Sequence, residues 1–148
     1  MSLDNIFRIS GSGMSAQTVR LNTIASNIAN AESTSSSIEE TYRARHPVFA
    51  LVRETVGQDG FRQMNFDKGV NSGYGVEVKG IVESNAPLQK RYEPHHPEAD
   101  EEGYVNYPNV NVVEEMADMI SASRSFQTNV EVMNTAKQMM QRILTLGQ

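Results

Sequence analysis

Both ends of this chain carry apolar residues spaced three and four positions apart over long stretches that contain no proline. This spacing places the residues along one face of an α-helix, and it is typical of helices that pair through a narrow seam. It predicts one helix from residue 2 to about residue 31 and a second from about Val112 to Leu146. Neither helix can bury its apolar face alone, so we expect them to pack against each other or against other chains.

The N-terminal helix is expected to bury one seam and to turn a polar side toward water. We assign Arg8, Arg20, Asn22, Ser26 and Asn27 to the polar side. The expected seam comprises Leu3, Phe7, Ser10, Met14, Gln17, Leu21, Ile24, Ile28 and Ala31.

Two glycines, Gly11 and Gly13, lie inside this predicted helix. A glycine in a helix interior costs about 1 kcal/mol relative to alanine. Its presence therefore suggests one of two structural reasons. Either the glycines kink the helix, or their missing side chains let another backbone approach closely, and the sequence leaves both possibilities open.

The C-terminal helix has a well-marked beginning. Pro108 ends the preceding strand, Asn111 stands at the N-cap position, and Glu114 occupies the capping-box position. Its methionines suit either a packed core or an adaptable interface. Ile120 and Ile143 widen the seam, which comprises Val112, Met116, Met119, Ser123, Phe126, Val130, Met133, Lys137, Met140 and Leu144.

The middle of the chain has turn residues and alternating apolar positions that predict β-structure. We expect strands at Val48–Val56, Val76–Glu83 and Leu88–Tyr92, with a turn at residues 57–60 and with Val76, Val78 and Val82 on one face. The predicted fold class is α+β, with the terminal helices paired as a coiled coil. The expected parts are an N-terminal helix at 1–31, a β-rich lobe at 32–108 and a C-terminal helix at 109–148.

Several classes of chemistry receive little support from the composition. The chain has no cysteine, which excludes disulfides and thiolate chemistry, and its net charge of −5 argues against a nucleic-acid partner. No apolar run is long enough to insert into a membrane. His95 and His96 precede Glu98, Asp100, Glu101 and Glu102, and this segment is interpreted as a solvated acidic loop rather than a metal site. We expect no catalytic residue and no cofactor.

Two segments at the chain ends resemble the terminal signatures of bacterial flagellar rod and hook axial proteins. The first runs from Met14 to Ala31 (MSAQTVRLNTIASNIANA), and the second runs from Glu114 to Asn129 (EEMADMISASRSFQTN). Between them, Tyr92 to Val105 (YEPHHPEADEEGYV) is similar to the proximal-rod members of that family. The resemblance covers nearly the whole chain.

This resemblance implies a structural subunit of the proximal rod of the flagellar basal body, which crosses the periplasm and transmits torque. The terminal helices would form an inner tube around a channel, with the β-rich lobe outside. The implied partners are copies of this chain, other rod proteins and the flagellar type III export apparatus, which would export the chain without a cleaved signal peptide. The terminal helices should stay loosely ordered until neighbouring subunits bury them.

The candidate packing interface between helices and between subunits consists of apolar positions on both terminal helices. Three alternatives remain open at this point: another axial rod or hook subunit, a cytoplasmic coiled-coil adaptor or export chaperone, and a metal-dependent hydrolase centred on His95 and His96. The interface positions are Leu3, Phe7, Met14, Leu21, Ile24, Ile28, Met116, Ile120, Phe126, Val130, Met133, Met140 and Leu144.

Overall fold

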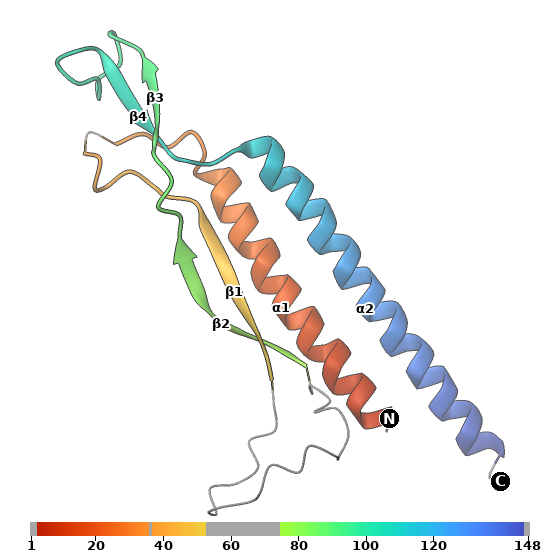
Figure 1. Ribbon diagram of the computed structural model, residues 1–148. Helices are drawn as coiled ribbons and strands as arrows, with labels where there is room; N and C mark the ends of the chain where they lie inside the picture. Colours follow the sequence, from red (N-terminus) through yellow and green to blue (C-terminus); the bar gives the residue numbers. More distant parts are fainter. Residues whose placement is uncertain (1–2, 36, 53–74, 147–148) are drawn as a thin grey trace, which may run out of the picture.

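The fold is α+β: within the described residues, one long helix lies toward each end of the chain and two small antiparallel sheets lie between them (Figure 1). The computed structural model describes residues 3–35, 37–52 and 75–146, so the predicted turn at 57–60 and the end of the strand predicted at Val48–Val56 lie outside the described residues. The elements are α1 (Leu3–Ala29), β1 (Arg45–Leu51), β2 (Val76–Glu83), β3 (Gln89–Tyr92), β4 (Tyr104–Tyr107) and α2 (Val112–Leu146).

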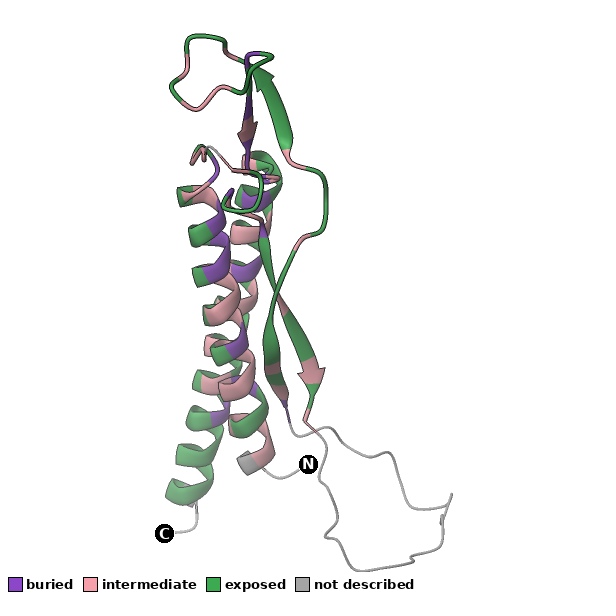
Figure 2. Ribbon diagram, turned by 90° about the vertical axis from the view of Figure 1, so that its left-hand side faces the viewer, coloured by how far each residue is buried: buried purple, intermediate pink, exposed green. Residues whose placement is uncertain are grey.

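The two helices run antiparallel along most of their length and make the most extensive contact between any two elements (Figure 1). The β1–β2 hairpin lies along α1, on the side away from α2. The β3–β4 pair projects beyond the end of the molecule where α1 finishes and α2 begins. Helix α1 is therefore the middle layer, and most of the outer surface of the hairpin and of α2 is exposed (Figure 2).

Local signals set the start of α2. The Asn111 side-chain oxygen accepts a hydrogen bond from the Val113 N–H at 3.2 Å, and its carbonyl accepts one from the Glu115 N–H at 3.0 Å. Glu114 and Glu115 place negative charge in the first turn, where the helix dipole favours it. The bounds predicted for this helix are confirmed, as is the N-cap.

The β1–β2 register corrects one expectation about the sheet. Phe49 pairs with Val78 and Val48 pairs with Gly80, so the register shifts there and Lys79 has no partner in the ladder. Val82 pairs with His46, and His46 lies on the opposite face of β1 from Phe49, the partner of Val78. Because alternate residues point to opposite faces, the bulge separates Val82 from Val76 and Val78. The prediction that all three share a face is wrong.

A small apolar cluster joins the helix ends to both sheets. Ala31, Ala44 and Val110 are buried together, with Tyr42 and Val112 packed against them. Asn109 holds this cluster in place: its side-chain oxygen accepts a hydrogen bond from the Ala44 N–H at 2.8 Å. Its amide donates to the Ala86 carbonyl at 2.9 Å.

The β3–β4 pair ends in a loop whose closure requires a glycine. Gly103 adopts a φ of +83°, which side chains rarely allow, and an added Cβ would lie 3.0 Å from the Tyr92 ring and 3.2 Å from Pro94. The missing side chain lets Tyr92 and Tyr104 pack edge to face, with their ring centroids 5.4 Å apart. This aromatic pair lies on the outermost part of the molecule.

Candidate assembly interface

The seam between α1 and α2 combines small, apolar and polar side chains. On α1, Ser10 and Ile24 are buried, and on α2, Ala122 and Ala136 are buried. Half-buried residues lie between these positions. The α2 side of the seam therefore follows residues 115, 119, 122, 126, 129, 133 and 136, which alternate steps of four and three as in a paired helix.

The predicted interface positions on α2 divide into those that pack in the helix pair and those that face outward. Phe126, Val130 and Met133 are half-buried in the helix pair, as expected for seam positions. Met116 and Ile120 are instead 55% and 57% exposed. Glu115 and Ala122 face α1 in their place, because a small residue and a hydrogen-bonded carboxyl let the two backbones come close together.

The α1 side agrees better with its predicted seam. Phe7, Met14, Leu21 and Ile28 are half-buried, and Ile24 is only 4% exposed. Leu3 lies at the start of α1, but its side chain is outside the described residues. The described positions among them lie on the part of α1 that is covered by the rest of the chain.

Asn27 overturns its assignment to the polar outer side of α1. It is fully buried, and its amide donates to the Arg45 carbonyl and to Glu115 Oε1, each at 2.9 Å. Its oxygen accepts from the Tyr42 hydroxyl at 2.8 Å and from the Arg45 N–H at 2.9 Å. A polar residue at this position therefore packs inward, because each of its hydrogen-bonding positions has a partner in the protein.

Gly13 explains how the helices come so close. A Cβ at this position would lie 3.0 Å from Asn129 Nδ2 on α2, whereas one at Gly11 would meet only the Met133 methyl group, at 4.0 Å. Helix α1 continues through both glycines (Figure 1). The atoms nearest to Gly13 belong to the Asn129 side chain and the atom nearest to Gly11 to the Met133 side chain, so α2 approaches α1 at these positions through side chains and not through its backbone.

Burial also shapes the electrostatics of the seam. Glu115 is buried, which raises the pKa of its carboxyl, while the hydrogen bond from Asn27 acts in the opposite direction. Burial likewise raises the pKa of the Tyr42 hydroxyl. A partly exposed ion pair joins Arg20 of α1 to Asp118 of α2 at 2.9 Å. Arg20 therefore also turns toward α2 rather than only toward water.

The end of α2 presents large apolar side chains to the outside. Met139, Ile143 and Leu144 are 54%, 58% and 66% exposed, and Met140 is 37% exposed. A shallow apolar groove of about 340 Å³ begins beside them, where α2 meets the first turns of α1. The groove is lined by Ile6, Thr128, Glu131, Val132, Thr135, Ala136 and Met139.

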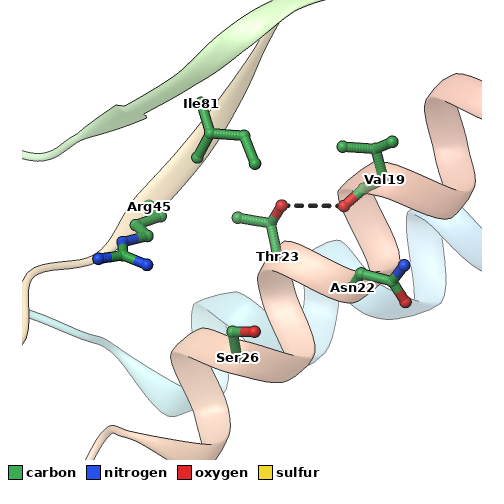
Figure 3. A pocket seen from close by; sticks show the side chains of 6 residues that line it. All are labelled: Val19, Asn22, Thr23, Ser26, Arg45 and Ile81. Carbon is green, nitrogen blue, oxygen red and sulfur yellow. Dashed lines mark hydrogen bonds between the residues drawn. The ribbon is translucent and has the colours of Figure 1, made fainter.

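A second cleft, of about 280 Å³, separates α1 from the β1–β2 hairpin (Figure 3). Val19 and Ile81 supply apolar walls, while Asn22, Ser26 and Arg45 supply polar ones. Thr23 lines the cleft as well, but its hydroxyl donates to the Val19 carbonyl at 2.9 Å.

The acidic loop is held by bonds between its own residues. His96 Nδ1 accepts a hydrogen bond from the Glu98 N–H at 3.2 Å, and Asp100 Oδ1 accepts from the Tyr104 N–H at 2.8 Å. His95 is exposed. Within residues 3–35, 37–52 and 75–146, no three His, Asp or Glu side chains converge as a metal site would require. Neither helix in this part of the chain is long and apolar enough to span a bilayer.

Comparisons with known proteins add an independent line of evidence. Residues 7–35 match the family model described as flagella basal body rod protein, and residues 101–146 match the model described as flagellar basal body rod FlgEFG protein C-terminal. The chain is 49% identical over its full length to the flagellar basal-body rod protein FlgC of Escherichia coli O6:H1. It is 47% identical to that of Salmonella typhimurium and 37% identical to that of Borreliella burgdorferi, and it covers 100% and 99% of those proteins.

Proposed function

This chain belongs to the FlgC family of flagellar basal-body rod proteins, and we propose that its α1–α2 helix pair is the part that packs against neighbouring subunits in the rod. It is a structural subunit of the basal body and assembles with other rod components. The finer proposal is a place in the proximal rod, where the helices line a channel and the β-rich parts lie outside.

The observation that carries this proposal is the exposure of large apolar side chains on α2. Monomeric proteins rarely leave contiguous apolar patches uncovered, and such patches mark interaction surfaces. Met116 and Ile120 cannot reach α1, because the seam lies on another side of the helix. Both belong to the interface predicted from the sequence, and contact with a second subunit would bury them.

The exposed side chains form two groups on different flanks and at different ends of α2. The first group is Val113, Met116 and Ile120, near the start of the helix, and the second is Val132, Met139 and Ile143, toward its end. With about 100° of rotation per residue, the two groups lie roughly 130° apart around the helix axis. If the first group of one copy packs against the second group of the next, the contact is heterologous. Repeated from copy to copy, such a contact builds an open helical assembly.

Met140 and Leu144 supply a further contact. They continue the α1-facing seam toward the end of α2 yet remain 37% and 66% exposed. We assign them to packing between subunits, and Ile24, Phe126 and Met133 to packing within the chain. We also propose that the chain divides, as the sequence predicts, into a helix at 1–31, a β-rich lobe at 32–108 and a helix at 109–148.

The remaining parts of the proposal concern how the chain reaches the rod. The family membership favours export through the flagellar type III apparatus without a cleaved signal and a final position in the periplasm. Loose ordering of the exposed ends before assembly suits that route, because it delays polymerisation until neighbours are present. Torque would pass through the interlocked helices rather than through loops.

Substitution of an exposed apolar residue tests the proposal without disturbing the core. In bacteria that rely on this chain for motility, Ile120→Asp should abolish swimming and remove the chain from purified basal bodies, since a buried unpaired charge is costly at an interface. Export into the periplasm should continue. Ser121→Asp places the same charge on the neighbouring exposed residue and should leave swimming intact. Normal motility of Ile120→Asp would contradict the proposal.

A further inference from the structure

Asn27 lies where four segments of the chain meet. Its side chain belongs to α1 and bonds to the first turn of α2 through Glu115, to β1 through both the N–H and the carbonyl of Arg45, and to the loop before β1 through Tyr42. All four contacts are between 2.8 and 2.9 Å long, and the residue is fully buried. The two donors and the two acceptor positions of one carboxamide are all used.

This arrangement specifies one position of the helices and of the hairpin. If α1 slid along α2, or if β1 moved away from α1, at least one of these buried groups would lose its partner without gaining water. Buried amides that select one register in this way are well documented in paired helices. The apolar seam alone is less selective, because equivalent seam positions recur every seven residues.

Glu115 is the carboxylic acid that bonds directly to this amide. The residue is 6% exposed, and its carboxyl accepts from Asn27 Nδ2 at 2.9 Å. Burial raises its pKa. The negative charges of Asp118 and Glu114 act in the same direction as burial. The hydrogen bond from Asn27, the charge of His46 and the helix dipole at the start of α2 act against it, and burial is the largest of these effects. The titratable or charged groups around Glu115 and the amide are Glu114 and Asp118 of α2, Arg45 and His46 of β1, Tyr42 of the loop, Glu83 of β2 and Arg20 of α1.

We propose that Asn27 and Glu115 form a proton-sensitive joint that holds the β1–β2 hairpin and the start of α2 on α1 more firmly when the Glu115 carboxyl is neutral than when it is ionised. The joint lies within one chain, so it operates without neighbouring subunits and goes beyond the assembly role proposed above. It makes the attachment of the hairpin to the helix pair depend on pH.

The direction follows from linkage between protonation and folding. An acid whose pKa is raised in the folded state binds its proton more tightly there than in the opened state. Below the ordinary pKa of a glutamate the carboxyl is neutral in both states, so no charge has to be buried. The cost of burying the charge grows as pH rises from that value to the raised pKa of the folded state. The joint should therefore weaken as pH rises from about 4.5, the ordinary pKa of a glutamate carboxyl.

Amide hydrogen exchange of the Arg45 N–H reports on the joint, because this group donates to Asn27 Oδ1. Exchange would be measured by NMR on the purified full chain between pH 4.5 and 7.5, after correction for intrinsic exchange. Protection should fall with rising pH, by up to tenfold for each unit by which the pKa of Glu115 is raised. In Glu115→Gln, whose oxygen can still accept from Asn27, protection should not depend on pH.

Glu114→Gln is the matched control, since it removes the same charge from the adjacent, exposed residue. It should retain most of the pH dependence of the unmodified chain. Equal pH dependence in the unmodified chain and in Glu115→Gln would overturn the proposal. Lack of Arg45 protection at every pH would also overturn it.

A pair of substitutions tests the proposal even if the single variants unfold. Asn27→Asp places an acceptor opposite the Arg45 carbonyl and Glu115, so it should abolish Arg45 protection. Combining it with Glu115→Gln supplies a donor to the new carboxylate and should restore protection at least in part. A double variant no better protected than Asn27→Asp would show that the two side chains are not coupled, contrary to the proposal.

Discussion

At the scale of single residues, the packing of this chain depends on polar side chains that satisfy several partners at once. Asn27 does this between α1, α2 and β1, and Asn109 does it between the loops that flank the sheets. A buried group that loses its partner costs about 1–3 kcal/mol, whereas a satisfied bond contributes only about 1 kcal/mol. Such residues therefore select one arrangement more strongly than they stabilise it.

Removing the Tyr42 hydroxyl tests this view. Tyr42→Phe keeps the ring in place but leaves Asn27 Oδ1 with one donor fewer. We expect the free energy of unfolding to fall by about 0.5–1.5 kcal/mol in urea titrations of the purified chain. Tyr92→Phe is the control, because Tyr92 is 65% exposed. Equal effects of the two substitutions would show that the buried bond contributes nothing.

The two glycines of α1 should respond differently to alanine. Gly11→Ala meets only the Met133 methyl group, at 4.0 Å, so it should raise the free energy of unfolding by about 0.5–1 kcal/mol through better helix propensity. Gly13→Ala brings a methyl group to within 3.0 Å of Asn129, and the resulting shift should cancel or reverse that gain. Thermal unfolding of both variants measures the difference, and equal melting temperatures would argue against close packing at Gly13.

At the scale of elements, the features that the sequence predicts correctly are those determined by residues close together in the chain. The bounds of α2, its Asn111 cap and the strand Val76–Glu83 follow from spacing, capping residues and alternation close along the chain. The side of α2 that faces α1 cannot be predicted in this way, because α2 carries apolar residues on more than one side. Met116 fits the spacing of a seam as well as Glu115 does, and only the partner Asn27 on α1 decides between them. The bulge at Lys79 is likewise set by pairing with β1.

Substitutions at two places on α2 should separate folding from assembly. Leu144→Ser changes a 66% exposed side chain and should leave the stability of the free chain within about 0.5 kcal/mol. It should nevertheless reduce incorporation into basal bodies, because the position is assigned to contact between subunits.

Ala122→Leu provides the opposite case. Ala122 is fully buried between the helices, and the larger side chain should cost about 1–3 kcal/mol in the free chain. Urea titration and immunoblots of purified basal bodies would measure both properties for both variants. If Leu144→Ser unfolded the free chain while Ala122→Leu did not, the assignment of the two surfaces would be wrong.

At the scale of the whole molecule, the chain is a helix pair with thin β-structure on one side (Figure 2). Exposed apolar groups lie at both ends of α2. This shape suits a subunit whose stability is completed by its neighbours. Free in solution, the chain should show less helix by circular dichroism than the 27 residues of α1 and the 35 of α2 together. Full helix content and a stable monomer would indicate that neighbours are not needed to order the ends.

Whether the exposed apolar side of α2 is covered in the rod can be measured directly, because the chain has no cysteine. A single Ile120→Cys variant would be treated with a water-soluble maleimide as free chain and in purified basal bodies, with Lys79→Cys on the hairpin for comparison. We expect rapid labelling of the free chain and strong protection of Cys at position 120 in the basal body. Equally rapid labelling in both states would contradict this expectation.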